Sequence, residues 1–271
     1  MYHHKTILIT GASSGLGRTM ALEYAKQGGR IINISRNHQK MNELQRQLEN
    51  INDQSHLFFS ANVSKYNEIK DIQSQLQKKQ ISPDVVIHNA AGNFLCTFEN
   101  ISENGWKTII DIVLHGGFNL YHIFGKSMIE QKKNGVFLHV STTYANTGSS
   151  FVIPSSVAKA GMDAMMKGLV VEWSKYNIRL VGIAPGPIED SGGASKLDPL
   201  GIFQYYNQTI NPRKRMGTQK EITELSMFLT SEKADYINGE IIRIDGGEVV
   251  KNSGEFNFLN HIPFFERILT K

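Results

Sequence analysis

Short apolar runs alternate along the chain with longer segments in which apolar residues recur every three to four positions. The runs are rich in Ile and Val and apolar on both faces, which is typical of buried parallel strands, whereas the longer segments have helical periodicity. The seven predicted strands span residues 5–10, 30–35, 56–61, 84–88, 135–140, 178–183 and 241–245. The main predicted helices span residues 18–27, 39–50, 67–79, 103–131, 156–176 and 220–230.

This alternation of strand and helix requires crossover connections, which are right-handed in nearly all proteins. We therefore expect an α/β fold: a single Rossmann-like, doubly wound, parallel seven-stranded sheet with helices on both faces. No linker rich in Pro, Gly or Ser divides the chain, and no internal repeat is visible. We expect one nucleotide-binding domain over residues 1–271.

Two regions depart from the alternation. Residues 185–218 contain four prolines and form a long connection between the sixth strand and the next helix. Connections of that length in compact domains usually carry function, so we expect a substrate loop there. The tail, residues 248–271, is rich in Phe and Ile. Such a tail must be covered, and we expect it to dock on its own or a neighbouring subunit rather than on a membrane.

Composition places the protein among ordinary globular proteins, with 40% hydrophobic and 20% charged residues. The formal net charge of +4 is mildly basic, without the long Lys/Arg runs that nucleic-acid binding favours. We expect no nucleic-acid partner and an anionic small-molecule substrate. No apolar stretch reaches the roughly 18 residues of a membrane span, so we expect no membrane insertion.

The single cysteine, Cys96, excludes an internal disulfide and suits a reducing compartment. We expect it to be a small buried hydrophobe rather than a nucleophile. The first predicted strand begins by about Lys5, which leaves no room before it for a signal or transit peptide. We therefore expect a soluble, cytoplasmic protein, most simply a bacterial one, with no metal site.

A glycine-rich turn, "TGASSGLG", follows the first strand and precedes the first helix. Glycines at this place let the backbone approach a pyrophosphate, which lies on the N-terminus of the helix. The alternative is a tight turn with no ligand. The residues expected at the cofactor here are Gly11, Ser13, Ser14, Gly15 and Leu16.

The end of the second strand bears on which dinucleotide binds. An NAD enzyme presents a carboxylate there to the ribose 2′-hydroxyl. This chain has Ser35 and Arg36 instead, and an arginine can bind a 2′-phosphate through two hydrogen bonds. The residues favour NADPH, unless Arg36 is only a solvated loop residue.

Three further motifs follow later strands: "NAAG" (89–92), a lysine in the helix after the fifth strand, and "PGPI" (185–188). In this order, at the carboxyl ends of strands, the motifs resemble those of the short-chain dehydrogenase/reductase family over nearly the whole chain. The resemblance implies cofactor contacts from Asn62, Val63, Asn89, Ala90, Gly92, Lys159, Pro185, Gly186, Pro187 and Ile188.

The stretch "STTYANTGSSFVIPSSVAK" (141–159) departs from most of that family, which places a tyrosine four residues before the lysine. That position is Ser155 here, and Tyr144 lies eleven residues upstream of it. This arrangement resembles 2,4-dienoyl-CoA reductases of the mitochondrial type, whose catalytic tyrosine occupies the Tyr144 position. Other stretches that carry this resemblance are "NAAGNF" (89–94), "WKTIIDIVL" (106–114), "APGPIEDSGGASKLDP" (184–199), "INGEIIRIDGGE" (237–248) and "SGEFN" (253–257).

The resemblance implies four catalytic residues. Tyr144 is the proton donor and Asn93 orients the enolate. Lys159 holds the nicotinamide-ribose hydroxyls and favours a nearby phenolate, and Ser155 donates a hydrogen bond near the nicotinamide. Hydride addition to a conjugated thioester produces an extended enolate, which needs hydrogen-bond donors at its oxygen, and a phenol with an amide suits that task.

Each residue also has a plainer interpretation. Tyr144 could be a packed loop aromatic and Asn93 a turn residue. Lys159 could be an exposed helix lysine, although the helix around it is small and apolar. Ser155 could be the N-cap of that helix, an interpretation at least as good as the functional one.

For the substrate, the resemblance implies acyl-CoA contacts from Phe94, Ser102, Tyr144 and Lys196. The arginines of Arg213–Arg215 have no such support and are expected to form a solvated charged turn. Asn62 replaces the aspartate that usually contacts adenine, though an amide could still do so. His115 stands where most of the family has an asparagine, and we expect it to fill space within a helix.

The sequence therefore predicts an NADPH-dependent reductase of 2,4-dienoyl-CoA thioesters, giving the 3-enoyl-CoA in the β-oxidation of unsaturated fatty acids, and by resemblance a homotetramer. The alternatives are another reductase of the family, such as a 3-oxoacyl or carbonyl reductase, or a non-catalytic NADPH-binding regulator. A carbonyl reductase is disfavoured because a serine cannot replace an acidic phenol at position 155.

Overall fold

A computed structural model describes residues 2–189, 202–255 and 257. Its centre is a seven-stranded sheet in which every pairing is parallel, with strand order β3-β2-β1-β4-β5-β6-β7. The strands are β1 (Thr6–Thr10), β2 (Arg30–Ser35), β3 (Leu57–Ser60), β4 (Val85–His88), β5 (Gly135–Val140), β6 (Ile178–Pro185) and β7 (Ile241–Ile244). All seven predicted strands are confirmed, with ends that differ from the prediction by at most two residues.

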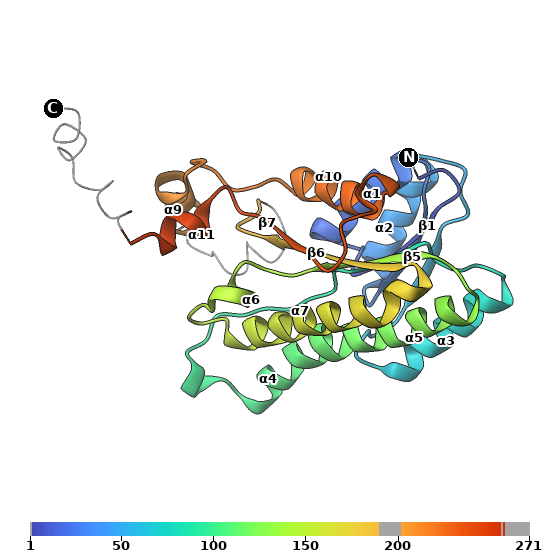
Figure 1. Ribbon diagram of the computed structural model, residues 1–271, viewed down its shortest axis with the longest axis horizontal. Helices are drawn as coiled ribbons and strands as arrows, with labels where there is room; N and C mark the ends of the chain where they lie inside the picture. The colour runs from blue at the N-terminus through green and yellow to red at the C-terminus, as the bar shows by residue number, and fades with distance from the viewer. Residues whose placement is uncertain (1, 190–201, 256, 258–271) are drawn as a thin grey trace.

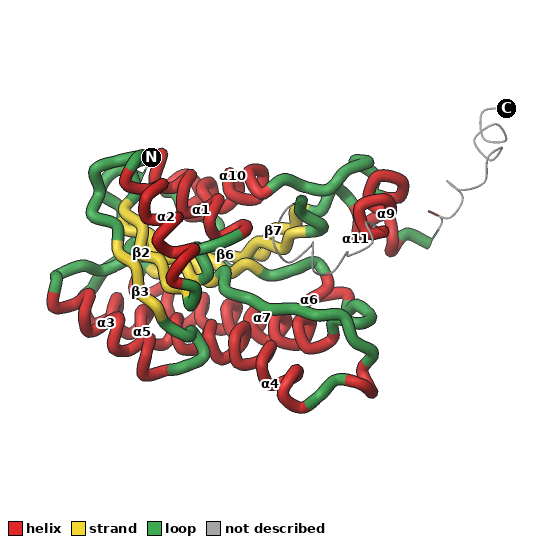
Figure 2. Tube along the Cα trace, turned by 180° about the vertical axis from the view of Figure 1, so that it is seen from behind, coloured by secondary structure: helices red, strands yellow, loops and turns green. Residues whose placement is uncertain are grey.

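Helices cover both faces of this sheet, as the alternating pattern predicts. In Figure 1, α1, α2 and α10 lie above the sheet and α3, α5 and α7 below it, and Figure 2 shows the same layers from behind. The helices are α1 (Gly15–Lys26), α2 (His38–Glu49), α3 (Tyr66–Lys78), α4 (Glu103–Ile110), α5 (Gly116–Glu130), α6 (Tyr144–Thr147), α7 (Ile153–Trp173), α9 (Ile202–Ile210), α10 (Gln219–Thr230) and α11 (Glu248–Ser253).

The core divides into two apolar layers because neighbouring strand residues point to opposite faces. In β1, Leu8 packs into the layer beneath α5 and α7, whereas Ile7 and Ile9 pack into the layer beneath α1 and α10. Both layers are fully buried at these positions. The near-continuous Ile/Val runs of the sequence therefore reflect a sheet that is covered on both sides.

The helix predicted over residues 103–131 is interrupted. A π-helical turn at Asp111–His115 separates α4 from α5. A π turn adds a residue to the helical turn and displaces backbone carbonyls from the regular ladder, often at functional sites. Here the displaced carbonyl of Val113 accepts a hydrogen bond from the buried His88 ring, 2.8 Å away.

The long connection after β6 contains α9, which the sequence pattern did not predict, and the tail begins with the short helix α11. Residues 190–201, and most of the apolar tail, lie outside the described residues. Ahead of that gap, Ile188 pairs with Gly217 in an isolated parallel bridge. The two ends of the connection are thus anchored to each other beside the last strands of the sheet.

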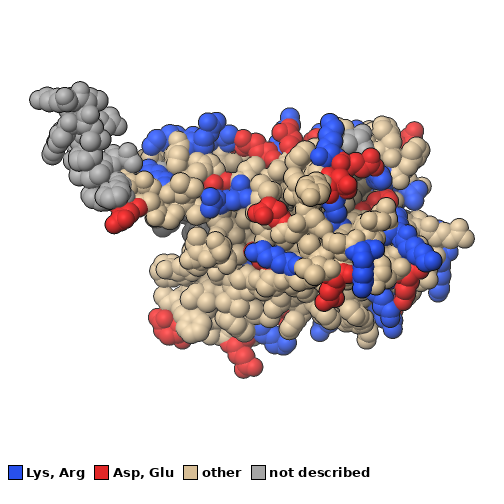
Figure 3. Space-filling view, in the orientation of Figure 1, with Lys and Arg blue, Asp and Glu red and all other residues tan. Residues whose placement is uncertain are grey.

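Charges of both signs are interspersed over the face shown in Figure 3. Within the described residues, no helix is long and apolar enough to cross a membrane. Nor do the described His, Cys, Asp and Glu residues gather into a group of three that could hold a metal ion.

Candidate active site

The glycine turn after β1 has the geometry that a dinucleotide pyrophosphate requires. Gly11 and Gly15 have φ angles of +71° and +53°, which residues with a Cβ rarely adopt. A Cβ on Gly17 would lie 2.5 Å from the Asn89 side-chain nitrogen, so this glycine permits close packing of α1 on the next loop. Ser14 at the start of α1 makes no side-chain capping hydrogen bond. The first N–H groups of α1 are therefore available to an anionic ligand.

The "NAAG" loop is locked against this turn. The Asn89 side chain donates to the Thr10 carbonyl over 3.0 Å, and the Thr10 hydroxyl accepts from the backbone N–H groups of Asn89 (3.1 Å) and Ala90 (3.0 Å). Threonine and asparagine thus brace the carboxyl ends of β1 and β4. These two strands flank the point where the strand order reverses, which is where ligands bind in such sheets.

At the end of β2, Ser35 is buried and donates to the Asn33 side chain, 2.7 Å away. Arg36 follows the strand, and its side chain is exposed beside the same edge of the sheet. The guanidinium is accordingly accessible to a ligand at this edge. Asn62 follows β3, and its side-chain oxygen accepts from the backbone N–H (3.1 Å) and hydroxyl (3.0 Å) of Ser64.

The structure brings three of the predicted catalytic residues together. Asn93 donates through its side-chain nitrogen to the Tyr144 hydroxyl over 3.1 Å, and that hydroxyl is hydrogen-bonded to the Ser155 hydroxyl over 3.3 Å. The oxygen of the Asn93 amide accepts from the backbone N–H of Phe94 at 2.9 Å, which turns the NH₂ group towards Tyr144. Tyr144 accepts one hydrogen bond and therefore keeps its own proton available for donation.

Two backbone ties hold the tyrosine loop in place. The Ser156 hydroxyl donates to the Tyr144 carbonyl over 2.7 Å, and the Cys96 N–H donates to the Phe151 carbonyl over 3.0 Å. Phe151 is held at a φ angle of +66°, an unusual conformation for a bulky residue. Strained conformations of this kind concentrate at functional sites. Cys96 is half-buried, so the expectation of a buried cysteine was wrong.

Ser155 is not a helix cap, contrary to the alternative that the sequence left open. Helix α7 begins at Ile153, and its N-cap is Val152, which has no side-chain capping bond. Pro154 occupies the first turn, where its missing N–H costs nothing. Ser155 is therefore inside the helix, and its buried hydroxyl faces Tyr144.

Lys159 lies one turn beyond Ser155 on α7 and is 5% exposed, so the interpretation as a surface lysine was wrong. Its ammonium donates to the Val140 carbonyl at the end of β5. Burial lowers the pKa of Lys159 to about 8, and the charge of Asp163 opposes that shift. A buried lysine whose pKa lies near neutrality is suited to proton chemistry.

The "PGPI" segment runs along the same edge of the sheet. Pro185 ends β6, and the Gly186 N–H donates to the Ile244 carbonyl over 3.0 Å. A Cβ on Gly186 would lie 2.8 Å from the Asp245 backbone, so only glycine fits there. Pro187 accepts from the Gly217 N–H at 2.9 Å. Four loops from four strands thus converge on one edge of the sheet.

Among the predicted substrate residues, Ser102 is engaged elsewhere, because its hydroxyl caps α4 by accepting from the Gly105 N–H at 3.0 Å. Phe94 follows Asn93 directly and packs against the core layer beneath α5 and α7. Val63, which was predicted to contact the cofactor, is buried, and its carbonyl accepts from the Asn119 side chain at 2.9 Å. The predicted substrate contact Lys196 lies outside the described residues.

His115 is not a space-filling residue, so that expectation was wrong. Its side chain is 57% exposed, and its Nδ1 lies 2.8 Å from the Asp111 carboxylate on the solvent side of the π turn.

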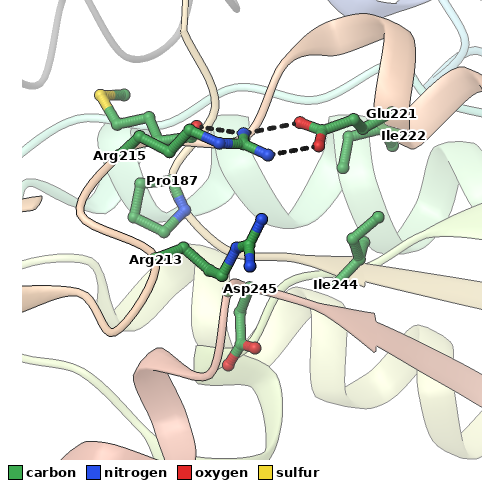
Figure 4. A pocket seen from close by; sticks show the side chains of 10 residues that line it. Pro187, Arg213, Arg215, Glu221, Ile222, Ile244 and Asp245 are labelled. Atoms are coloured by element: carbon green, nitrogen blue, oxygen red, sulfur yellow. Dashed lines mark hydrogen bonds and ion pairs between the residues drawn. The ribbon is translucent and has the colours of Figure 1, made fainter.

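The basic turn Arg213–Arg215 borders a cavity of about 250 Å³ beside Pro187 (Figure 4). Arg215 is committed to Glu221 through two hydrogen bonds of 2.9 and 2.6 Å, and Glu221 also completes the capping box of α10. Arg213 projects into this cavity in Figure 4, and its exposed side chain fits the expected solvated turn.

Three residues near Lys159 were missed by the sequence interpretation: the buried His88 in β4 and His139 in β5, and the half-buried Asp163 in α7. Both histidines are fully buried. A signal was present, because histidine is unusual in strands that are otherwise Ile, Val and Leu. Their proximity to Lys159 depends on strand pairing, which places His88 directly opposite His139.

Comparison with known proteins places the chain in a family with this fold. The family model described as Enoyl-(Acyl carrier protein) reductase matches residues 11–248. The chain belongs to the short-chain dehydrogenase/reductase family, a class of oxidoreductases, and membership implies a nicotinamide cofactor.

Among curated relatives, a protein of Bacillus subtilis (strain 168) is 38% identical over 96% of this chain and 99% of its own length. It is named probable 2,4-dienoyl-CoA reductase [(2E)-enoyl-CoA-producing]. The mouse peroxisomal 2,4-dienoyl-CoA reductase [(3E)-enoyl-CoA-producing] is 30% identical over 91% of this chain and 87% of its own length. A solved short chain dehydrogenase from Bacillus anthracis is 38% identical, with a TM-score of 0.81 over 90% of this chain and 96% of that one.

Proposed function

We propose that this protein is an NADPH-dependent 2,4-dienoyl-CoA reductase that converts 2,4-dienoyl-CoA thioesters to 3-enoyl-CoA. The observation that carries the proposal is the hydrogen bond from Asn93 to Tyr144, with Ser155 on the other side of the same hydroxyl. The family description and the names of the relatives supply support, since all concern reduction of a double bond conjugated to a thioester.

Bound NADPH would supply a hydride for C5 of the diene. The electron pair then passes through the conjugated bonds to the thioester oxygen and gives a dienolate. The Asn93 amide and the Tyr144 hydroxyl, which already lie 3.1 Å apart, are the two neutral donors for that oxygen. Protonation at C2 completes the 3-enoyl product, whereas protonation at C4 would give the 2-enoyl product. The names of the relatives include both outcomes.

The residues of this chain fit a nicotinamide dinucleotide. Gly11 and Gly15 in left-handed conformations leave room for the pyrophosphate at the uncapped start of α1, and Lys159 would hold the nicotinamide-ribose hydroxyls. Arg36 is accessible at the end of β2, where no carboxylate stands to repel a 2′-phosphate. The accessible Arg36 guanidinium and the absence of a carboxylate at this place favour NADPH over NADH.

The competing activity is reduction of a 3-oxoacyl or other carbonyl substrate. A carbonyl reductase protonates an alkoxide, which requires an acidic donor at the position four before the lysine. Ser155 occupies that position, buried and hydrogen-bonded to Tyr144. A non-catalytic regulator is disfavoured because the donor pair and the buried lysine converge on one edge of the sheet.

The decisive experiment measures NADPH oxidation by the purified protein with 2,4-hexadienoyl-CoA and, in parallel, with acetoacetyl-CoA. We expect turnover of the first and little of the second, with the product identified by NMR. Turnover of acetoacetyl-CoA alone would replace the proposal with carbonyl reduction. NADPH binding without turnover of either substrate would favour the regulator.

We further propose a cytoplasmic homotetramer acting in the β-oxidation of unsaturated fatty acids. The family resemblance and the apolar tail support an oligomer, and the single cysteine suits a reducing compartment. Light scattering at micromolar concentration tests the assembly: a monomer with the tail intact would contradict it.

A further inference from the structure

Beyond Lys159 along the chain, α7 carries a second ionisable residue. Asp163 follows Lys159 by one helical turn, so the two side chains share a face of α7. The Ser141 hydroxyl, just past β5, donates to one Asp163 carboxylate oxygen over 2.9 Å. The other oxygen is buried without a hydrogen-bond partner. The Asp163 side chain is 16% exposed, so this carboxylate lies largely inside the protein.

Two histidines form the opposite wall of this cluster. His139 is fully buried with its Nε2 atom 3.5 Å from the unpartnered Asp163 oxygen, and neither of its ring nitrogens has a hydrogen-bond partner. Its ring stacks on that of His88, with centroids 5.6 Å apart. A Cβ on Gly117 would lie 3.0 Å from the His88 ring, so the glycine at this point of α5 lets the stack pack closely.

The histidines do not supply charge. Burial lowers the pKa of His88 to about 3 and holds that of His139 well below its usual range, and the positive charge of Lys159 lowers both further. The distance between His139 and Asp163 is within ion-pair range, but a neutral imidazole forms no salt bridge. The pair is therefore a neutral, polar wall between the sheet and α7.

Among the described ionisable groups around Lys159, the Asp163 carboxylate is the one that favours the charged form of the lysine. Tyr121 of α5 is fully buried, and burial raises its pKa, so it is neutral. Burial raises the pKa of Asp163, whereas the Ser141 hydrogen bond and the charges of Lys159 and Lys167 oppose that shift. On the π turn, Asp111 pairs with Lys107 and His115 at the surface. Among the described residues that bear on the charge of Lys159, Asp163 is the one acidic group.

We propose that Asp163 is a positioning residue whose carboxylate, anchored by Ser141, keeps the buried ammonium of Lys159 protonated where it donates to the Val140 carbonyl at the end of β5, while the neutral His88–His139 stack shields the pair from water. The proposal rests on the role of Lys159 in the proposed function, since holding ribose hydroxyls and stabilising a phenolate both require the charged form. No sequence motif of the site includes this carboxylate.

The proposal predicts a pH effect with a definite sign. The ammonium exists below the pKa of Lys159 and is lost above it. The pH profiles of activity and of NADPH affinity should therefore each fall on the alkaline side, and this falling part is the alkaline limb. An opposite charge within about 4–6 Å shifts a pKa by about one unit or more. Removing the Asp163 charge lowers the pKa of Lys159, because the carboxylate opposes the effect of burial. The limb should then move to lower pH.

The test compares Asp163→Asn with wild type between about pH 6 and pH 10, a range that spans the lysine titration. Single-turnover NADPH oxidation with 2,4-hexadienoyl-CoA gives one profile, and NADPH affinity from fluorescence titration gives a second. We expect both limbs to move down by about one pH unit. At the low end of the range the variant should approach wild-type values.

Three further variants separate this role from a structural one. Asp163→Glu restores a carboxylate and should return the limb towards its wild-type position. Glu172→Gln removes the same charge from an exposed position of α7 and should leave the limb unchanged. Ser141→Ala keeps the carboxylate but removes its anchor, so a smaller shift in the same direction is expected, and this variant serves if Asp163→Asn does not fold.

A uniform loss at every pH with an unmoved limb, or an equal shift in Glu172→Gln, would overturn the proposal. The binding profile needs no acyl-CoA substrate. If the wild-type protein does not reduce the dienoyl thioester, the proposed function fails, but the alkaline limb of NADPH binding still decides the role of Asp163.

Discussion

Asn93 donates a hydrogen bond to the Tyr144 hydroxyl over 3.1 Å, although 51 positions of sequence separate the two residues. They meet because β4 and β5 are parallel neighbours, so the loops at their carboxyl ends leave the same edge of the sheet. The amide orientation is set locally by the Phe94 N–H. The pair is thereby arranged in advance for a developing negative charge, which is how electrostatic stabilisation gains most of its effect.

The first prediction concerns the proton donor. Tyr144→Phe should lower kcat by about 10²–10³-fold, because the lost hydroxyl acts on charge that develops only in the transition state. NADPH affinity should stay unchanged. Ser155→Ala should cost less, since serine is too weak an acid to protonate an enolate. Single-turnover NADPH oxidation measures both; full activity in Tyr144→Phe beside a collapse in Ser155→Ala would place the donor at Ser155.

The second prediction concerns the amide. Asn93→Ala should lower kcat by about tenfold or more, as expected for removal of one of two donors to the same oxygen. Asn93→Asp is nearly isosteric but cannot donate when ionised and places negative charge beside the enolate, so it should be slower still above its titration. Steady-state kcat at saturating substrate distinguishes the two. Equal, small losses would mean that Asn93 only shapes the loop.

The third prediction concerns cofactor choice. Arg36→Ala should raise the KM for NADPH and leave that for NADH nearly unchanged, because the guanidinium would contact only the 2′-phosphate. Arg46→Ala, in the last turn of α2, removes the same charge from an exposed helix position and serves as the control. A parallel loss with both cofactors would show that Arg36 does not recognise the phosphate.

The fourth prediction concerns stability against acid. The pKa of His88 is about 3 in the folded protein, against about 6.5 when unfolded, so the unfolded state binds the extra proton first. The free energy of unfolding should be fully retained above about pH 6.5 and decline as the pH falls towards the folded pKa. At about pH 5 the decline from His88 alone is about 2 kcal/mol.

Urea titrations of wild type and His88→Asn at about pH 7 and pH 5 measure that decline. Asparagine offers an amide donor for the Val113 carbonyl but does not titrate in this range, so its pH dependence should be weaker than that of wild type. Parallel curves for the two proteins would mean that acid destabilisation comes from other groups.

Much of the fold follows from the linear pattern. The seven apolar runs and the helical segments between them determined the strands, their parallel pairing and the two-layered cover of helices, because the five inner strands are buried on both faces. The glycine turn and the "NAAG" and "PGPI" motifs also marked their own loops. Local glycine conformation and helix start signals do not depend on distant contacts.

Other features were decided only by tertiary contacts. Ser155 reads as a helix cap in sequence, but Pro154 lies inside the first turn of α7, so the helix begins earlier and buries the serine against Tyr144. The π turn in the helix over residues 103–131 leaves no mark in the hydrophobic periodicity. The Val113 carbonyl in this turn is hydrogen-bonded to His88 of a strand, a contact that exists only in the folded protein. The sequence placed His115 in the interior, but its side chain is exposed. Which face of a helix is buried depends on how the helix packs on the sheet, and the sequence does not state that directly.

The cluster behind Lys159 shows the same limit most clearly. Lys159 and Asp163 share a face of α7 by helical spacing, which the sequence alone determines. His88 and His139 are separated along the chain and lie opposite each other only through the pairing of β4 with β5. Burial of these imidazoles, and the pKa shifts that follow from it, arises when α5 and α7 close over the sheet. Charge state is a property of the folded environment, and the sequence specifies it only through the fold.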